Sequence, residues 1–183
     1  METAGKTSSY IVLAIDVGIY NMGAAFIEYV GNEAIVKKLD WRPLFMEGES
    51  INIVDIVRAV GAYVTIITRL DDLPLVPNVV LIEQQYAGKG GSNFHAMEVA
   101  VALFSCFHER FPNAALRSVS PSARGWGKSR AKALGRALAE SSGKLAYSYL
   151  LELEKAETGR SQHVCDALTM IVDSMSFAGM EQL

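Results

Sequence analysis

The stretch YIVLAIDVGIYNMGAAFIEYV, residues 10–30, decides how this chain is expected to fold. Its opening run, YIVLAID (10–16), is almost wholly apolar and ends in an aspartate, which is typical of a buried strand. GAAFIEYV (23–30) and AIVKKLDW (34–41) follow at hairpin spacing, with a Gly-Asn pair between them. The pattern predicts that three strands open the fold.

Beyond these strands, helical and strand patterns alternate. The predicted elements are a helix over 51–70 capped by Ser50, a strand over 78–85, a helix over 93–111, a strand over 114–121, a basic helix from about Ser129 into the 140s, and a last helix after Ser161. Antiparallel strands followed by this alternation predict an α/β fold with a mixed five-stranded sheet flanked by helices. We expect one domain spanning 1–183, because no linker or repeat interrupts the pattern.

Composition favours a globular intracellular protein. Half of the 183 residues are apolar and a fifth are charged, so a substantial core is expected. No apolar run approaches the roughly 20 residues that span a bilayer, and residues 1–10 lack a secretory pattern. We therefore expect no membrane partner and a cytoplasmic address, or a nuclear, viral-factory or organellar one depending on the source. Cys106 and Cys165 lack paired spacing and are expected to be reduced thiols.

Charge is unevenly distributed along the chain. The formal net charge of −3 argues against a uniformly basic coat for nucleic acid. The segment 117–136 nevertheless contains basic residues and no acidic one. These basic residues are Arg117, Arg124, Lys128, Arg130, Lys132 and Arg136. One local positive face is therefore predicted, although a charge run is also common on a merely solvated surface.

Two carboxylates stand at the ends of predicted strands. Asp16 ends the first strand, where Gly18 lets the backbone turn away, and Glu83 ends the strand VVLIE in the same manner. If the two strands are neighbours, both carboxylates reach one edge of the sheet. Either residue alone could instead be only a turn former or a helix cap.

The last predicted helix carries polar groups that could reach the same edge. His163 and Asp166 are three residues apart in HVCDALTMIVDSM (163–175), and hence share a helix face. Clustered carboxylates repel one another unless divalent cations lie between them. The four groups therefore predict a Mg²⁺ or Mn²⁺ site, with two ions suited to phosphodiester cleavage. His163 could bind metal, transfer a proton or simply be a satisfied histidine, and Asp173 is placed outside the site.

Four motifs together carry a family resemblance. They are IDVGIYNMG (15–23), LIEQQ (81–85) before a Gly-rich loop and long helix, SVSPS (118–122) and HVCDAL (163–168). The chain resembles the RuvC-type Holliday junction resolvases of the ribonuclease H-like superfamily, especially their poxviral and fungal mitochondrial branch. The resemblance implies a homodimer that cuts two symmetric strands of a four-way DNA junction. It also implies metal binding by Asp16, Glu83 and Asp166, with His163 where many members have aspartate, and Asn21 matches an asparagine of the viral and mitochondrial branch.

DNA contacts are expected around the glycine-rich loop and the basic helix. The candidate phosphate contacts are Lys89, Arg124, Lys128, Arg130, Lys132 and Arg136. Tyr86 and Phe94 flank the loop and could stack on an opened base, although for Phe94 the expected role is core packing. The helix 95–107 carries Met97, Val101 and Phe104 at helical spacing, which fits either a dimer interface or the core.

Two other classes of function compete with a resolvase. An actin-like or sugar-kinase-like ATPase fragment would share a first loop like IDVGIYNMG, but the second phosphate loop of those proteins does not follow. Nor is GWGKS (125–129) a P-loop, because Ser122 stands where its first glycine is required. The non-enzymatic alternative is a module that binds branched DNA without cutting it.

Overall fold

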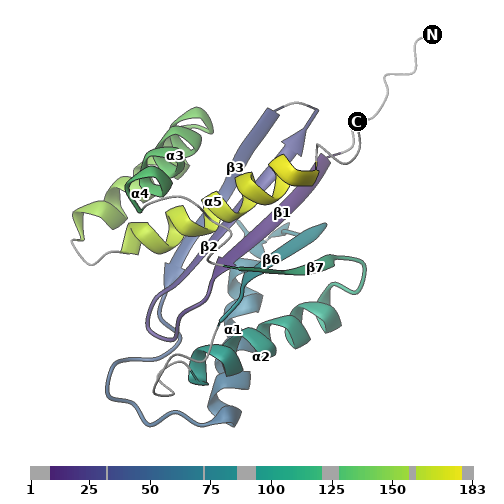
Figure 1. Ribbon diagram of the computed structural model, residues 1–183, viewed down its shortest axis with the longest axis vertical. Helices are drawn as coiled ribbons and strands as arrows, with labels where there is room; N and C mark the ends of the chain where they lie inside the picture. The colour runs from purple at the N-terminus through teal and green to yellow at the C-terminus, as the bar shows by residue number, and fades with distance from the viewer. Residues whose placement is uncertain are drawn as a thin grey trace.

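A mixed five-stranded sheet forms the centre of the computed structural model, between two layers of helices (Figure 1). The structure describes residues 9–31, 33–71, 73–85, 94–120, 128–156 and 160–178. In sheet order, the strands are β3 (Glu33–Arg42), β2 (Met22–Val30), β1 (Ser9–Asp16), β6 (Val79–Glu83) and β7 (Ala115–Val119). The first three are antiparallel and the last two continue parallel to β1, so the predicted mixed sheet is confirmed.

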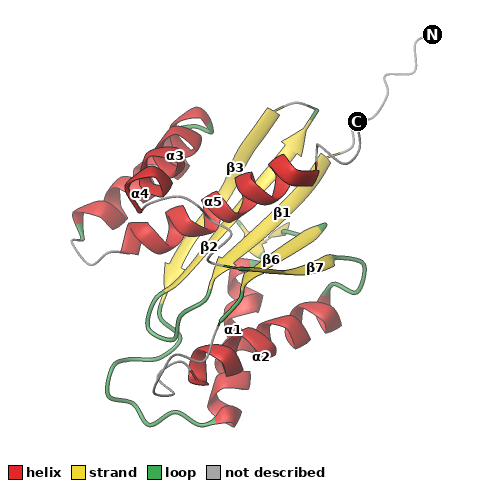
Figure 2. Ribbon diagram, in the orientation of Figure 1, coloured by secondary structure: helices red, strands yellow, loops and turns green. Residues whose placement is uncertain are grey.

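The helices divide between the two faces of the sheet (Figure 2). One face is covered by α1 (Ile53–Ile67) and α2 (Phe94–Arg110). The other is covered by α3 (Lys128–Ser141), α4 (Lys144–Lys155) and α5 (Arg160–Ala178). A short hairpin of β4 (Arg69–Leu70) and β5 (Leu73–Pro74) follows α1. In the described part of the chain, no helix is both long and apolar enough to cross a membrane.

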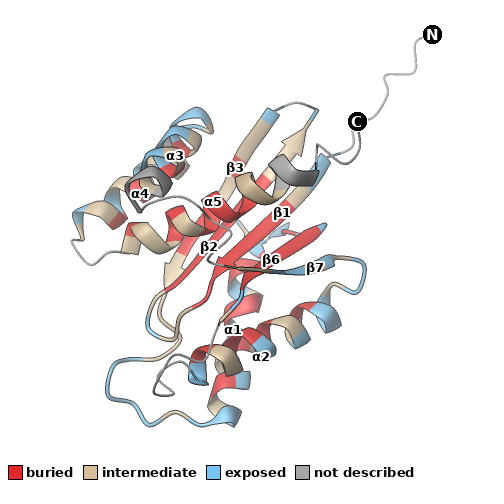
Figure 3. Ribbon diagram, viewed as in Figure 1, coloured by how far each residue is buried: buried red, intermediate tan, exposed pale blue. Residues whose placement is uncertain are grey.

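The central strands are buried on both faces, which explains their continuous apolar sequence (Figure 3). Successive side chains of a strand point to opposite faces. Leu13 and Ile15 accordingly join the core beneath α1 and α2, whereas Val12 and Ala14 join the core beneath α5. This alternation places Asp16 on the α5 face, directly below the helix that carries His163.

The boundaries of α1 differ from the prediction at both ends. Asn52 rather than Ser50 is the N-cap, and its side-chain oxygen accepts hydrogen bonds from the amides of Val54 (2.9 Å) and Asp55 (3.1 Å). At the other end, the Lys38 ammonium donates to carbonyls of the last turn and of β4. The chain then enters the β4–β5 hairpin, so the helix stops short of residue 70.

The helical layer over the second face contains one helix that the sequence reading missed, α4. Its residues follow Gly143, whose φ of 110° ends the path of α3 and lets the chain reverse. Within this layer α3 meets α5 at Gly135, where an added Cβ would lie 2.6 Å from the Cys165 sulfur. Both cysteines are free thiols as predicted, and burial raises the pKa of Cys165 to about 12.

Candidate active site

Asp16 and Glu83 lie at the same edge of the sheet. Each is the last residue of its strand, and β1 and β6 pair in parallel up to Ile15 and Ile82. Both residues are buried, with exposed fractions of 6% and 9%. The parallel pairing therefore brings together two carboxylates that are 67 positions apart in the sequence, as the strand ends predicted.

His163 lies against Asp16. Its Nδ1 is 2.6 Å from Oδ2 of Asp16, which is a hydrogen bond between α5 and the end of β1. The contact depends on Gly23, which is opposite Asp16 in the β1–β2 register. A Cβ at Gly23 would overlap the His163 carbonyl and lie 2.8 Å from the Val164 amide nitrogen. The absence of a side chain at this position lets the α5 backbone rest directly on β2.

Glu83 is held by a residue that the sequence reading passed over, Gln85. The Gln85 side-chain amide donates to Oε2 of Glu83 at 3.1 Å and to the Val17 carbonyl at 3.3 Å. It thereby joins the chain after β6 to the chain after β1 and orients one carboxylate of the pair. The signal in the sequence was the amide two residues beyond the strand-end glutamate.

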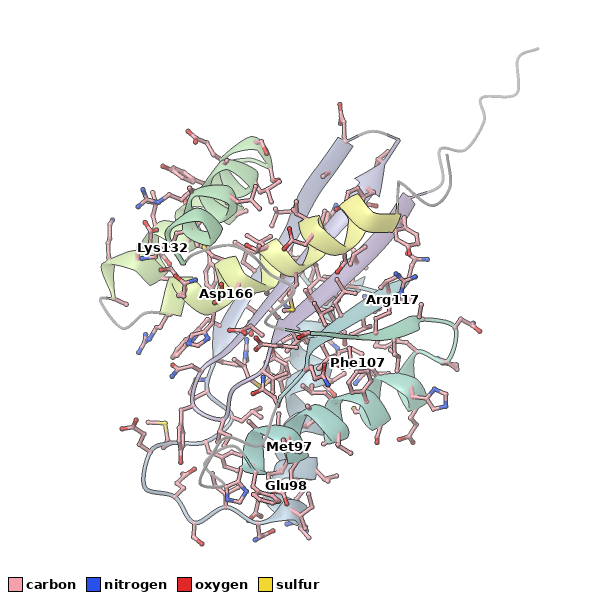
Figure 4. The ribbon with its side chains drawn as sticks, in the orientation of Figure 1. Met97, Glu98, Phe107, Arg117, Lys132 and Asp166 are labelled. Atoms are coloured by element: carbon pink, nitrogen blue, oxygen red, sulfur yellow. The ribbon has the colours of Figure 1, made fainter. Side chains whose placement is uncertain are left out.

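Asp166 lies one helical turn beyond His163 and is half-buried (Figure 4). Gln162, on the preceding turn, donates its amide to Oδ1 of Asp166 at 2.9 Å. Asp166 and Glu83 thus each accept a hydrogen bond from a glutamine. Hydrogen bonds of this kind orient carboxylates that bind metal.

The donor chemistry of these four residues suits a hard divalent cation. Carboxylate oxygens and one imidazole nitrogen are ligands that Mg²⁺ and Mn²⁺ accept. Among the described residues, however, no group of three or more Asp, Glu, His or Cys side chains is positioned to hold a metal ion. The structure brings Asp16 together with His163 and places Glu83 at the adjacent strand end. The full four-residue set remains a prediction.

Two of the predicted DNA contacts have described side chains, and both are on α3. Lys132 is half-buried in the same layer of helices as Asp166 (Figure 4). Arg136 is exposed and forms a bidentate ion pair with Glu154 of α4, with Nε 3.0 Å from Oε1. The Glu154 carboxylate raises the pKa of Arg136. Arg136 therefore already has an intramolecular partner that the basic run did not reveal.

The other candidate DNA contacts lie partly or wholly outside the described residues. The backbone of Lys128 and Arg130 is in α3, but their side chains lie outside the described residues. Lys89, Arg124 and Tyr86 also lie outside them, so their predicted roles stay predictions. Phe94 is 62% exposed at the start of α2, so the expectation that it packs in the core is wrong.

Comparisons with solved structures place this architecture among known folds. Thermus thermophilus RuvC in complex with Holliday junction substrate superposes with a TM-score of 0.62 at 13% identity, covering 93% of this chain and 96% of that one. The fowlpox virus Holliday junction resolvase gives 0.55 at 16%, covering 92% and 99%. The yeast mitochondrial Holliday junction resolvase Ydc2 gives 0.58 at 15%, covering 86% and 74%.

These likenesses extend over most of the chain but are remote in sequence. No protein-family model matches the sequence, and no curated protein matches it either. At such low identity the structural likeness establishes the fold. The fold is ribonuclease H-like, and the resemblance to RuvC-type resolvases is confirmed at that level.

Proposed function

We propose that this protein is a metal-dependent endonuclease that resolves four-way DNA junctions by paired symmetric cuts. The observation that carries the proposal is the juxtaposition of Asp16 and Glu83 at neighbouring strand ends, with His163 held on Asp16. It occurs in a fold that superposes on three structures of resolvases from a bacterium, a poxvirus and a mitochondrion. We take residues 1–183 to act as one domain.

Asp16, Glu83, His163 and Asp166 are the residues that would hold Mg²⁺ or Mn²⁺, two ions per site. Bound ions of this kind supply activation of the attacking water and charge stabilisation of the leaving oxygen. The chain itself supplies orientation. Gln85 fixes the Glu83 carboxylate, and Gln162 fixes Asp166.

Asp16 also determines which nitrogen of His163 can take part in the reaction. When Nδ1 donates its proton to Asp16, the neutral imidazole carries its lone pair on Nε2. That nitrogen is then the atom that would bind a metal or take a proton from water. Metal binding and proton transfer, the two roles that the sequence leaves open for His163, therefore both use Nε2. Replacing His163 with a residue that offers an oxygen ligand distinguishes the two roles.

Paired cutting requires two chains, because each chain carries one site. An isologous homodimer matches the two-fold symmetry of a four-way junction. On α2, Val101 is 66% exposed, and Phe94 is exposed at the start of the helix. Met97 is half-buried, and Phe104 packs partly against the core. We propose that the face centred on Val101 is the dimer interface.

The proposal is tested with a labelled synthetic four-way junction and a duplex of the same sequence. We expect preferential binding of the junction, and cleavage that requires Mg²⁺ or Mn²⁺ and stops with chelator. Binding of the junction that is independent of metal, without cleavage under any condition, would support the non-enzymatic alternative instead. No preference for the junction over the duplex would remove the proposed substrate.

A further inference from the structure

A pocket of about 370 Å³ opens beside the candidate active site. It is lined by Tyr20 and Asn21 of the β1–β2 loop, by Trp41 of β3 and by Arg160 of α5. Trp41 is opposite Gly23 in the β2–β3 register, and Gly23 is opposite Asp16 in the β1–β2 register. Since neighbouring strands are about 4.8 Å apart, the backbone at Trp41 is about 10 Å from that at Asp16.

Arg160 is held flat against one wall of this pocket. Its guanidinium carbon is 4.2 Å from the centroid of the Trp41 ring, and the Trp41 amide donates to the Tyr149 hydroxyl at 3.0 Å. Arg160 is three residues before His163 on α5, so one helical turn separates the guanidinium-bearing residue from the imidazole. The stack therefore fixes a cation at a set position relative to Asp16.

Two donors of this stack lack an acceptor in the part of the chain that the structure describes. Nε of Arg160 and Nε1 of Trp41 are buried, and neither has a hydrogen-bond partner among the described residues. Glu47 also lines the pocket, but no ion pair joins it to Arg160 in the described part of the chain. Buried donors without partners are rare in native proteins and often mark a place where a ligand or water supplies the acceptor.

We infer that Arg160, stacked on Trp41, binds a phosphate of the DNA strand that is cut, at a position beside the scissile phosphate. This inference rests on the proposed function. The planar guanidinium matches phosphate oxygens in a bidentate manner, and stacking on an aromatic ring restricts its rotation. A cationic side chain at this position attracts the phosphate backbone of the incoming strand.

The position of the pocket sets the register of the contact. Successive phosphates of one strand are at least about 3.4 Å apart along the helix axis, so a separation of about 10 Å places the contacted phosphate within about three nucleotides of the scissile one. Tyr20 also lines the pocket and is 36% exposed, so it is available to stack on a neighbouring sugar or base. Arg160 is thus a positioning residue that selects which phosphate reaches Asp16.

The experiment compares Arg160→Gln with the matched control Arg110→Gln. Arg110 is also stacked on an aromatic ring, with 6.0 Å from its Cζ to the Phe111 centroid, and it donates to the Thr65 hydroxyl. It ends α2, which runs back from the carboxyl end of β6 to the amino end of β7, away from the site. Both variants lose one positive charge, so a difference in junction binding between them reports a local contact of Arg160.

Each protein is tested on a four-way junction carrying a single neutral methylphosphonate at successive positions around the cut. For the wild type and Arg110→Gln, we expect one position within about three nucleotides of the cut to weaken binding about 10-fold or more. Arg160→Gln should bind the all-phosphate junction more weakly by a similar factor. A methylphosphonate at the sensitive position should then weaken its binding no further. Its plot of log affinity against log salt should have a slope smaller by about 0.9.

The outcomes separate this inference from the proposed function. A wild-type protein that neither prefers nor cuts the junction overturns both. A wild type that binds and cuts, but has no sensitive position beside the cut, overturns the phosphate contact alone. So does an Arg160→Gln protein with wild-type affinity, or one that remains sensitive at that position. If Arg160→Gln does not fold, as judged by circular dichroism, Arg160→Lys and the wild-type map decide, because Lys retains charge without the planar fork.

Discussion

Gly23→Ala tests whether the close approach of α5 to β2 organises the active site. The added Cβ would overlap the His163 carbonyl and lie 2.8 Å from the Val164 amide nitrogen, and both are backbone atoms that cannot rotate away. We expect α5 to shift outward, at a cost of about 1–3 kcal/mol, as for other insertions into packed interiors. For a chain of this size, the melting temperature should fall by about 2–12 °C.

The same shift should damage catalysis more than folding. It would lengthen the 2.6 Å contact between His163 and Asp16, and a misplacement of about 1 Å can reduce a rate about 100-fold. Junction cleavage under single-turnover conditions measures the loss, with Gly61→Ala as the control. A Cβ at Gly61 meets nothing within 4 Å inside α1, so this variant should match or slightly exceed the wild type in stability. Wild-type cleavage by Gly23→Ala would refute the role assigned to this contact.

Three further predictions concern the site and the assembly. Asp16→Asn, Glu83→Gln and Asp166→Asn should each abolish cleavage in a gel assay while retaining junction binding, and normal cutting by any one would remove that residue from the site. His163→Asp should stay active and shift its preference toward Mg²⁺ in a metal titration, because oxygen replaces nitrogen, whereas complete inactivity would point to proton transfer. Sedimentation should give about twice the 19.9 kDa chain mass for the wild type and the single mass for Val101→Glu, and a wild type that stays monomeric with junction DNA would exclude paired incision by a dimer.

Sequence patterns predicted those parts of the fold that depend on local burial. The run 10–16 is apolar because β1 is buried on both faces, and the terminal residues of two such strands had to meet once the strands were neighbours. The placement of Asp16 and Glu83 at one edge of the sheet followed from that topology. The spacing of three residues predicted that His163 and Asp166 share one face of a helix, and α5 contains both residues.

Features that depend on tertiary contacts were not visible in the sequence. Asn52 caps α1 although Ser50 is an equally good capping residue, because in the folded chain the Asn52 side-chain oxygen accepts from the amides of Val54 and Asp55. The amide of Gln85 joins two strand ends that only the folded sheet brings together. The stack of Arg160 on Trp41 likewise joins positions 119 residues apart, and neither residue has a local pattern that predicts it.

Paired incision by two sites is tested most directly on a supercoiled plasmid that extrudes a cruciform. Mixed dimers, formed by refolding wild-type chains with tagged Asp16→Asn chains and isolated by the tag, carry one active site each. Wild-type dimers should convert the plasmid to linear DNA in Mg²⁺ or Mn²⁺ and leave it supercoiled in chelator, because both cuts fall within one bound complex. Mixed dimers should yield nicked circles. Linear product from mixed dimers at the wild-type rate, or cutting of any kind in chelator, would contradict the account.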